Sequence, residues 1–143
     1  MHIRKAMDAD IDAIVLIEKQ GEDLWKRDFF SDELDKPLSL FFVAEIDKEV
    51  AGFIIIWVIA GEIQLHNIAV SQKYRRQRIG NHLLEFIETY SYGEKPNSIQ
   101  LEVREGNTGA RAFYETNGFK VIGKRPKYYN DESAVLMEKQ LNA

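Results

Sequence analysis

The 143-residue sequence contains no cysteine, so disulfides, thiolate catalysis and cysteine-bound zinc are excluded. Its three prolines are scattered and mark local breaks rather than a domain boundary. The longest apolar run, Val50 to Ile59, contains Gly52 and is too short to cross a bilayer as a helix. Residues 1–5 lack the long apolar stretch of a signal peptide. These absences predict a cytoplasmic protein that has no membrane partner.

The composition is typical of one globular domain. Hydrophobic residues make up 45% of the chain and charged residues 29%, which indicates a globular protein, and the length of 143 residues predicts a single domain over residues 1–143. The net charge of −4 requires any nucleic-acid surface to be a local patch, so nucleic acid is not expected as a partner. The three histidines form no metal-ligand pattern, and His66 is expected to be structural. We therefore expect no metal site.

The hydrophobic pattern predicts a mixed α/β chain. Helices are expected at 8–18, with Asp8 as N-cap, at 29–34 and 79–87, and from 107 to 114, with Asn107 as N-cap. Strands are expected at 2–5, 40–46, 50–58, 63–70, 98–104, 119–123 and 134–139. Turns at 47–49 and 60–61 make an antiparallel meander of the first long strands. The fold class is thus α/β, a mostly antiparallel mixed sheet flanked by helices.

A basic loop joins the strand ending Ile68-Ala69-Val70 to the helix that begins near Gly80. The loop reads Tyr74-Arg75-Arg76-Gln77-Arg78-Ile79, and Lys73 precedes it. A helix start presents backbone N–H groups and the positive end of the helix dipole, which attract phosphate. A glycine there lets a ligand approach the backbone closely. The residues themselves leave two alternatives open: a solvated basic turn and an RNA-binding patch.

A second motif follows in Leu101-Glu102-Val103-Arg104 and in Asn107 to Phe119. The latter contains Asn107, Ala110, Tyr114, Gly118 and Phe119 at the spacing N-x-x-A-x-x-x-Y-x-x-x-G-F. Together with Arg75-x-x-x-x-Gly80, it resembles the GCN5-related N-acetyltransferase (GNAT) family. The resemblance implies the GNAT fold and acetyl-coenzyme A as co-substrate. It also implies that the pantetheine arm lies between two splayed strands, Ile63–Val70 and Ser98–Arg104.

The resemblance implies a set of coenzyme-binding residues around the strand end, the loop and the helix start. They are Ile68, Ala69, Val70, Arg75, Arg76, Gln77, Arg78, Ile79, Gly80, Asn81 and Asn107. The family signature, (Q/R)-x-x-G-x-(G/A), has its first glycine where this chain has Arg78. Because a positive φ would strain an arginine, we predict a negative φ at Arg78, with its N–H still offered to the pyrophosphate. For Asn107, helix capping alone would also explain the residue.

The same resemblance implies two catalytic residues. An attacking amine must lose a proton, and Glu102 stands in the Leu-Glu-Val-Arg context in which RimI-type ribosomal-protein alanine N-acetyltransferases carry their proton acceptor. Tyr114 corresponds to the family's general acid, and a backbone N–H near Val70 to its oxyanion donor. The alternatives are an exposed Glu102 paired with Arg104 and a core tyrosine packed beside Phe113. Without cysteine, transfer is expected to be direct, within a ternary complex.

The stretch Lys127 to Ala134 resembles the substrate loop of protein Nα-acetyltransferases. Tyr128 and Tyr129 are implied to bind the acceptor's N-terminal backbone from a loop between the last two strands. Ser133 stands where an acidic residue is often found. An ordinary exposed loop is the alternative. Leu24-Trp25 and Phe29-Phe30 lie where the family has an acceptor-lining loop, although hydrophobic contacts of the second helix explain them equally well.

The predicted activity is acetylation of a protein N-terminus, with a ribosomal protein as a possible acceptor. Three rival functions remain at this point. The acceptor could be a small-molecule amine or a lysine side chain, the chain could be a non-catalytic coenzyme A-binding module, or the basic loop could bind RNA. The sequence does not indicate the oligomeric state.

Overall fold

The computed structural model describes residues 1–20, 25–129 and 132–141, with the backbone alone for residues 127–129. The helices are α1 (Ile11–Glu18), α2 (Arg27–Asp35), α3 (Ile79–Thr89) and α4 (Thr108–Thr116), with 3₁₀ turns η1 (Asp8–Asp10) and η2 (Gln72–Tyr74). The strands are β1 (His2–Lys5), β2 (Ser39–Ile46), β3 (Glu49–Ile59), β4 (Glu62–Val70), β5 (Ser98–Arg104), β6 (Lys120–Tyr129) and β7 (Glu132–Gln140). No helix within the described residues is long and apolar enough to span a membrane.

The strands form one mixed sheet in the hydrogen-bonded order β1-β2-β3-β4-β5-β7-β6. β1 with β2, β2 with β3, β5 with β7 and β6 with β7 pair antiparallel. The β4–β5 pairing is parallel and matches Glu62–Gln64 with Ser98–Gln100. The predicted α/β class with a mostly antiparallel mixed sheet is confirmed.

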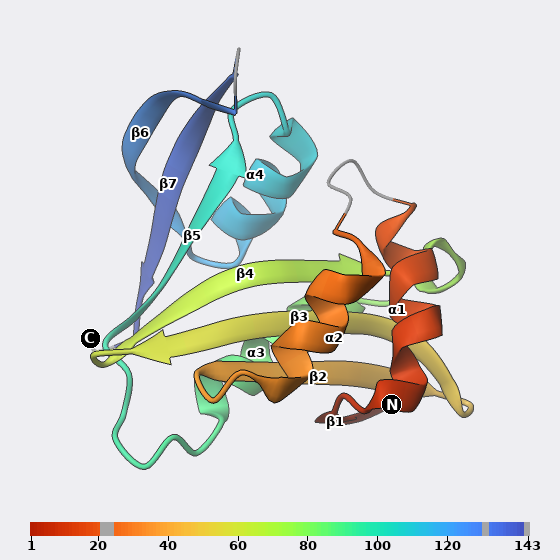
Figure 1. The fold of residues 1–143 in the computed structure, drawn as a ribbon. Coiled ribbons are helices and arrows are strands. Elements are labelled where there is room, and N and C mark those ends of the chain that lie inside the picture. Colours follow the sequence, from red (N-terminus) through yellow and green to blue (C-terminus); the bar gives the residue numbers. More distant parts are fainter. Residues whose placement is uncertain (21–24, 130–131, 142–143) are drawn as a thin grey trace. The chain divides into compact units, whose positions relative to one another are not determined.

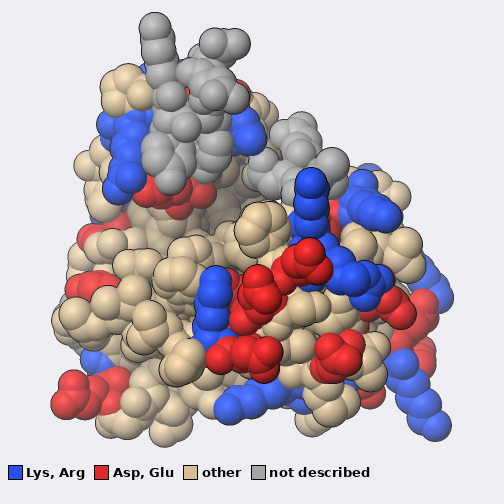
Figure 2. All heavy atoms as spheres, in the orientation of Figure 1, with Lys and Arg blue, Asp and Glu red and all other residues tan. Residues whose placement is uncertain are grey.

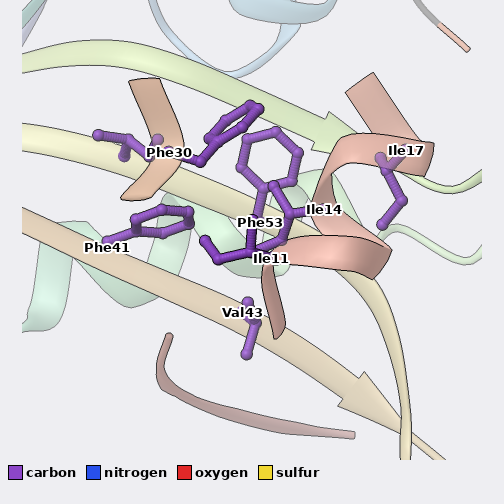
Figure 3. Packing of buried hydrophobic residues seen from close by; sticks show 8 residues of the cluster. Ile11, Ile14, Ile17, Phe30, Phe41, Val43 and Phe53 are labelled. Carbon is purple, nitrogen blue, oxygen red and sulfur yellow. The ribbon is translucent and has the colours of Figure 1, made fainter. Parts of the chain in front are cut away.

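The chain divides into two compact units. The first comprises residues 1–58 and 66–90, and the second residues 59–65 and 91–143. In the first unit, α1 and α2 lie on one face of β2 and β3, and α3 lies on the other (Figure 1). Ile11 and Ile14 of α1 meet Phe30 of α2 and Phe53 of β3 in a core from which water is excluded (Figure 3). Burial of these apolar side chains is the main force that holds the helices on the sheet.

The opposite face of the first unit is covered by α3. Its Leu83, Leu84 and Ile87 recur at helical spacing and are buried. Phe86 packs edge-on against Phe42 of β2, with ring centroids 4.9 Å apart. Because Ile79, in the first turn, is buried with them, the start of α3 is held in a fixed place on this unit.

The second unit is built on β5, β7 and β6, with α4 packed beside them. Ile99, Leu101 and Val103 of β5 are buried in alternation with polar residues. Tyr114 of α4 and Phe119, which follows the helix, are buried as well. One apolar face of the strands and one face of α4 therefore make the core of this unit.

The first helix does not start as predicted. Asp8 is not an N-cap, because it lies within η1, which Met7 precedes as the cap residue. The carboxylate that binds the start of the helix is that of Asp10 instead. It accepts the Met7 N–H at 2.8 Å and pairs with the Arg4 guanidinium at 2.8 Å. The ion pair with β1 fixes Asp10 where η1 passes into α1, a contact that a local capping pattern does not reveal.

Candidate functional site

The connection between β4 and α3 is positioned by a bulge and a glycine in β3. Ala44 pairs with Gly52 and Glu45 with Val50, so Ala51 is the extra residue of a bulge. The Ala51 carbonyl accepts the Ser71 N–H at 2.8 Å, which fixes the exit of the chain from β4. A Cβ at Gly52 would meet the Ala69 carbonyl oxygen at 2.9 Å. The missing side chain therefore lets the end of β4 lie close to β3.

The first cation of the basic loop, Lys73, is already engaged. Its ammonium pairs with Glu49 at 2.8 Å, and the buried Tyr74 hydroxyl donates to the same carboxylate at 2.5 Å. The hydrogen bond from Lys73 lowers the pKa of Glu49, and Glu49 in turn raises the pKa of Lys73. Lys73 thus anchors the loop to the β2–β3 turn, and its charge is compensated within the protein.

The other three cations of the loop differ from Lys73. Arg75, Arg76 and Arg78 are exposed, and none has a carboxylate partner among the described residues. On the face that carries α1 and α2, by contrast, acidic and basic side chains are interspersed (Figure 2). The loop therefore presents three guanidinium groups that an anion can bind without first displacing a carboxylate.

The prediction of a negative φ at Arg78 is wrong. Arg78 is the N-cap of α3 in the left-handed conformation, with φ 60° and ψ 25°, and Arg76 also has a positive φ of 66°. The chain is extended at Arg75 and must turn sharply to enter the helix. The turn uses the left-handed conformation that glycine adopts without steric cost. For an L-residue this conformation costs about 1–2 kcal/mol, so Arg78 is strained.

The helix start remains suited to an anion despite this strain. The first hydrogen bond inside α3 joins the His82 N–H to the Arg78 carbonyl at 3.0 Å. The N-terminal turn, Ile79-Gly80-Asn81, directs its N–H groups out of the helix end, where the helix dipole is positive. Gln77 completes the predicted loop set and is exposed.

Glu102 lies on the polar face of β5, between the buried Leu101 and Val103. Its carboxylate pairs with the Arg125 guanidinium of β6 at 3.3 Å. Arg104 instead pairs with Glu132 of β7 at 3.7 Å. The alternative that Glu102 pairs with Arg104 is therefore wrong, because the partner lies two strands away.

The turn after β5 carries the N-cap of α4, as predicted. The Asn107 side-chain oxygen accepts the Ala110 N–H at 3.2 Å. Glu132 accepts the Gly106 N–H at 3.2 Å, and the Arg111 guanidinium donates to the Glu105 carbonyl at 3.0 Å. These contacts order the turn from both sides. The side-chain oxygen of Asn107 thus serves as the N-cap of α4.

Tyr114 lies on the inner face of α4 and is only 8% exposed. Its ring packs edge-on against Phe113 and Phe119, both at 5.5 Å between centroids. Its backbone carbonyl accepts the N–H groups of Asn117 and Phe119 at the end of the helix. The side chain is held firmly by apolar neighbours, as either a core tyrosine or a positioned acid would be.

The predicted acceptor residues are only partly described. The backbone of Lys127, Tyr128 and Tyr129 belongs to β6, so these residues are not in a loop as predicted. The side chains of Tyr128 and Tyr129, and the whole of Leu24, lie outside the described residues. The strand continues because β6 pairs with β7 past an irregularity between Arg125 and Tyr129.

The aromatic residues near the start of α2 divide between core and surface. Phe30 is fully buried, and the ring of Trp25 lies 5.7 Å from it. Phe29, in contrast, is 57% exposed. The backbone N–H of Trp25 donates to Glu18 at 2.8 Å. This role of Glu18 was not predicted, although a carboxylate on the apolar face of a short helix is a signal of an internal acceptor.

His66 of β4, which was expected to be structural, lies beside Trp57. The ring centroids are 4.1 Å apart with the planes tilted by 43°, and desolvation lowers the pKa of His66. The Trp57 indole N–H donates to the buried Glu33 at 3.0 Å. Among the described residues no group of three His, Asp or Glu side chains is placed to hold a metal ion.

The predicted residues thus fall into two groups. Ile68, Ala69, Val70 and the loop up to Asn81 belong to the first unit, and Glu102, Asn107 and Tyr114 belong to the second. Within the first, a strand end, three exposed arginines and a helix start converge. Within the second, a paired carboxylate and a buried phenol flank the β5–α4 turn.

Comparison with known proteins places the chain in a family. The Acetyltransferase (GNAT) family profile matches residues 10–119. The N-alpha-acetyltransferase of Sulfurisphaera tokodaii is 35% identical over 154 residues, covering 94% of this chain and 90% of that protein. The ribosomal protein bS18-alanine N-acetyltransferase of Escherichia coli K12 is 32% identical over 133 residues, covering 90% and 89%. The crystal structure of the ribosomal-protein-S18-alanine N-acetyltransferase from Escherichia coli matches with a TM-score of 0.87 and 30% identity, covering 99% of this chain and 94% of that one. The chain therefore belongs to the GNAT family of acetyltransferases.

Proposed function

We propose that this chain transfers the acetyl group of acetyl-coenzyme A to the N-terminal α-amino group of a protein. GNAT enzymes use acetyl-coenzyme A as their acetyl donor. The observation that carries the choice of acceptor is the likeness, over at least nine tenths of this chain, to relatives named for acetylation of N-terminal amines. The family match, residues 10–119, includes parts of both compact units, so we propose that they act as one acetyltransferase domain over residues 1–143.

The loop before α3 would bind the diphosphate of the donor. The fit rests on Arg75, Arg76 and Arg78, whose guanidinium groups are exposed and carry no internal counter-ion among the described residues. Arginine offers a planar fork of N–H groups that matches phosphate oxygens. The N–H groups of Ile79 and Gly80 would add the dipole of the helix start. Ile68, Ala69, Gln77, Asn81 and Asn107 complete the proposed binding set.

Glu102 is proposed as the proton acceptor for the attacking amine. A free α-amino group has a pKa of about 7.7–8.0 and is mostly protonated at neutral pH. Glu102 projects from the polar face of β5 and is 29% exposed at its side chain, so an incoming amine can reach it. It would accept the proton directly or through one water. The neutral amine then has the lone pair that attack requires.

Tyr114 is proposed as the general acid, and the Val70 N–H as the donor to the developing oxyanion. Acetyl-coenzyme A supplies an acyl group activated as a thioester. The Tyr114 phenol can give the sulfur its proton as it departs, and the packing against Phe113 and Phe119 limits the movement of its ring. Because the sequence has no cysteine, transfer is direct rather than through an acetyl-cysteine intermediate.

The acceptor is proposed to be a protein N-terminus recognised by Tyr128 and Tyr129. Phenol hydroxyls can bond the peptide groups of the first residues, and their rings can shape the wall of a slot. The name of the Escherichia coli relative points to the N-terminal alanine of a ribosomal protein as the acceptor to test first. A ribosomal acceptor would place the work of the enzyme in the cytoplasm.

Mass spectrometry of two matched peptides tests this proposal. One begins with a free alanine and contains an internal lysine, and the other has the same sequence with a formylated N-terminus. Incubation with acetyl-coenzyme A should add one acetyl group to the α-amine of the first peptide and none to the second. Acetyl on lysine in both peptides, or acetylation of a polyamine alone, would show that the acceptor is a different amine.

Two further outcomes would reject the enzyme assignment itself. Coenzyme A binding without turnover of any peptide, lysine or polyamine would indicate a non-catalytic module. RNA affinity that falls steeply with salt and is lost on substitution of Arg75 and Arg76 would instead indicate an RNA-binding patch.

A further inference from the structure

The proposed proton acceptor already has a cationic partner. The Glu102 carboxylate lies 3.3 Å from the Arg125 guanidinium. The pair spans β7, because Glu102 is opposite Leu136 in one ladder and Gly123 is opposite Leu136 in the other. Arg125 lies two residues beyond Gly123, so its long side chain reaches back across β7. The position of the guanidinium therefore depends on the register of three strands.

The charged groups around this pair have other partners. Arg104 pairs with Glu132, and Lys124 pairs with Glu105. Gln100 donates to Glu138 at 2.7 Å on the same face of β5. Arg125 is thus the cation assigned to Glu102 in the described part of the chain. An acceptor amine, which arrives as a cation, must bind the same carboxylate that Arg125 contacts.

The contact is suited to exchange. The Glu102 side chain is 29% exposed and the Arg125 side chain 56%. The shortest approach between the guanidinium and the carboxylate is 3.3 Å, longer than the roughly 2.7–2.9 Å of a strong charged hydrogen bond. Exposed ion pairs of this kind change an equilibrium constant by no more than about fivefold. An ammonium group of equal charge can therefore replace the guanidinium at little cost.

We propose that Arg125 is the exchangeable counter-ion of Glu102, held by the carboxylate until the ammonium of the acceptor displaces it. The inference rests on the proposed function, since it needs Glu102 to receive the amine. On displacement, the ammonium transfers one proton to Glu102 and becomes a neutral amine with a free lone pair. Arg125 keeps its own proton throughout, because guanidinium does not deprotonate in proteins. Arg125 is thus a positioning residue that sets how readily the acceptor engages, and it does not take part in the proton transfer.

Removal of the guanidinium tests the exchange. Arg125→Met retains a long apolar stem, and we expect it to lower the KM for the free-alanine peptide by about two- to fivefold. The KM for acetyl-coenzyme A should be unchanged. Peptide titrated into enzyme saturated with coenzyme A should bind more tightly by the same factor, which gives a readout independent of turnover. Arg125→Lys keeps the charge and should stay close to wild type.

Lys124→Met is the matched control. It removes the same charge from the neighbouring position of β6, but Lys124 pairs with Glu105 and not with Glu102. Its peptide KM should remain that of wild type. An equal fall in both methionine variants would indicate a general electrostatic effect, and an unchanged or higher KM in Arg125→Met would also overturn the exchange.

The failure of the exchange and the failure of the proposed function give different results. If wild type acetylates the peptide and Glu102→Gln does not, the proposed function stands. The peptide KM of Arg125→Met then tests only the exchange of Arg125 for the acceptor. If Glu102→Gln retains full turnover, or wild type acetylates no N-terminus, both the proposed function and the exchange are rejected.

Discussion

The Glu18 carboxylate accepts the Asn67 side-chain amide at 3.2 Å, which joins the end of α1 to β4 inside the first unit. Glu18 is 4% exposed and also accepts the Trp25 N–H. One buried carboxylate thus connects three segments of the chain. Because a buried polar group without a partner is costly, the contact should be visible in stability as well as in structure.

Glu18→Ala should lower the free energy of unfolding by about 2–4 kcal/mol, since it leaves the Trp25 N–H and the Asn67 amide without their acceptor. Urea unfolding followed by circular dichroism measures the change. Glu18→Gln alone should lower the free energy of unfolding by less than Glu18→Ala. Glu18→Gln combined with Asn67→Asp should recover part of that stability, because the carboxylate and the amide exchange places. No recovery in the double variant would mean that the contact contributes little.

The strain at Arg78 predicts a difference between two small substitutions. Arg78→Gly removes the Cβ from a left-handed position, whereas Arg78→Ala keeps it. The glycine variant should be the more stable of the two by about 1 kcal/mol in urea unfolding, the reverse of their order in a helix interior. Both should lose the same coenzyme A affinity. An alanine variant as stable as the glycine variant would argue against the left-handed conformation.

The exposed arginines of the loop should differ from the paired lysine in ligand binding. Arg75→Gln and Arg76→Gln should each weaken coenzyme A binding by about 5- to 20-fold, because a charged hydrogen bond to phosphate is lost. Calorimetric titration measures the effect, which should shrink as salt is raised. Lys73→Gln is the control, since Lys73 is engaged by Glu49. Equal losses in all three variants would mean only that net charge matters.

The proposed catalytic pair should control turnover without controlling donor binding. Glu102→Gln should lower kcat by about 10²- to 10⁴-fold, as expected when a general base is removed. Tyr114→Phe keeps the ring that packs against Phe119, so its melting temperature should stay near wild type while kcat falls. The affinity for acetyl-coenzyme A should equal that of wild type in both variants. Full turnover in either variant would reject the role assigned to that residue.

Stability should depend on pH through Asp10. The hydrogen bond from Arg4 lowers the pKa of Asp10 below its ordinary value of 3.8. The unfolded state then binds the proton more readily, so the stabilisation is fully present above about pH 4 and is lost as pH falls through the lowered pKa. Asp10→Asn should flatten this part of the pH–stability curve measured by urea unfolding. Asp8→Asn, at an exposed neighbour, should leave its shape intact.

Local patterns predicted most of the elements. Ser98–Arg104 was predicted residue for residue, because its apolar positions alternate strictly. β6 was predicted to end at Gly123 but continues to Tyr129. The extension contains Pro126 and charged residues, which a pattern of alternating hydrophobicity excludes. It forms because β6 lies at the edge of the sheet, where a strand can contain proline, and pairs with β7.

The site was predicted less completely than the fold, for physical reasons. The partner of Glu102 depends on the register of β5, β7 and β6, which a local motif does not contain. The φ of Arg78 was predicted from the intrinsic preference of arginine, yet the geometry of the turn into α3 overrides that preference. Spacing along the chain identifies which residues a motif carries, whereas contacts distant in sequence determine what each one touches.

Gly52 shows how a residue can matter to ligand recognition without meeting a ligand. It lies buried in the middle of β3, and the Ala69 carbonyl occupies the space that any side chain there would need. Enlarging this position would push the strand end away from β3 and carry the arginine loop with it. A saturation screen scored on acetyltransferase activity should therefore find position 52 as intolerant as the loop itself, and a search for ligand contacts would overlook it.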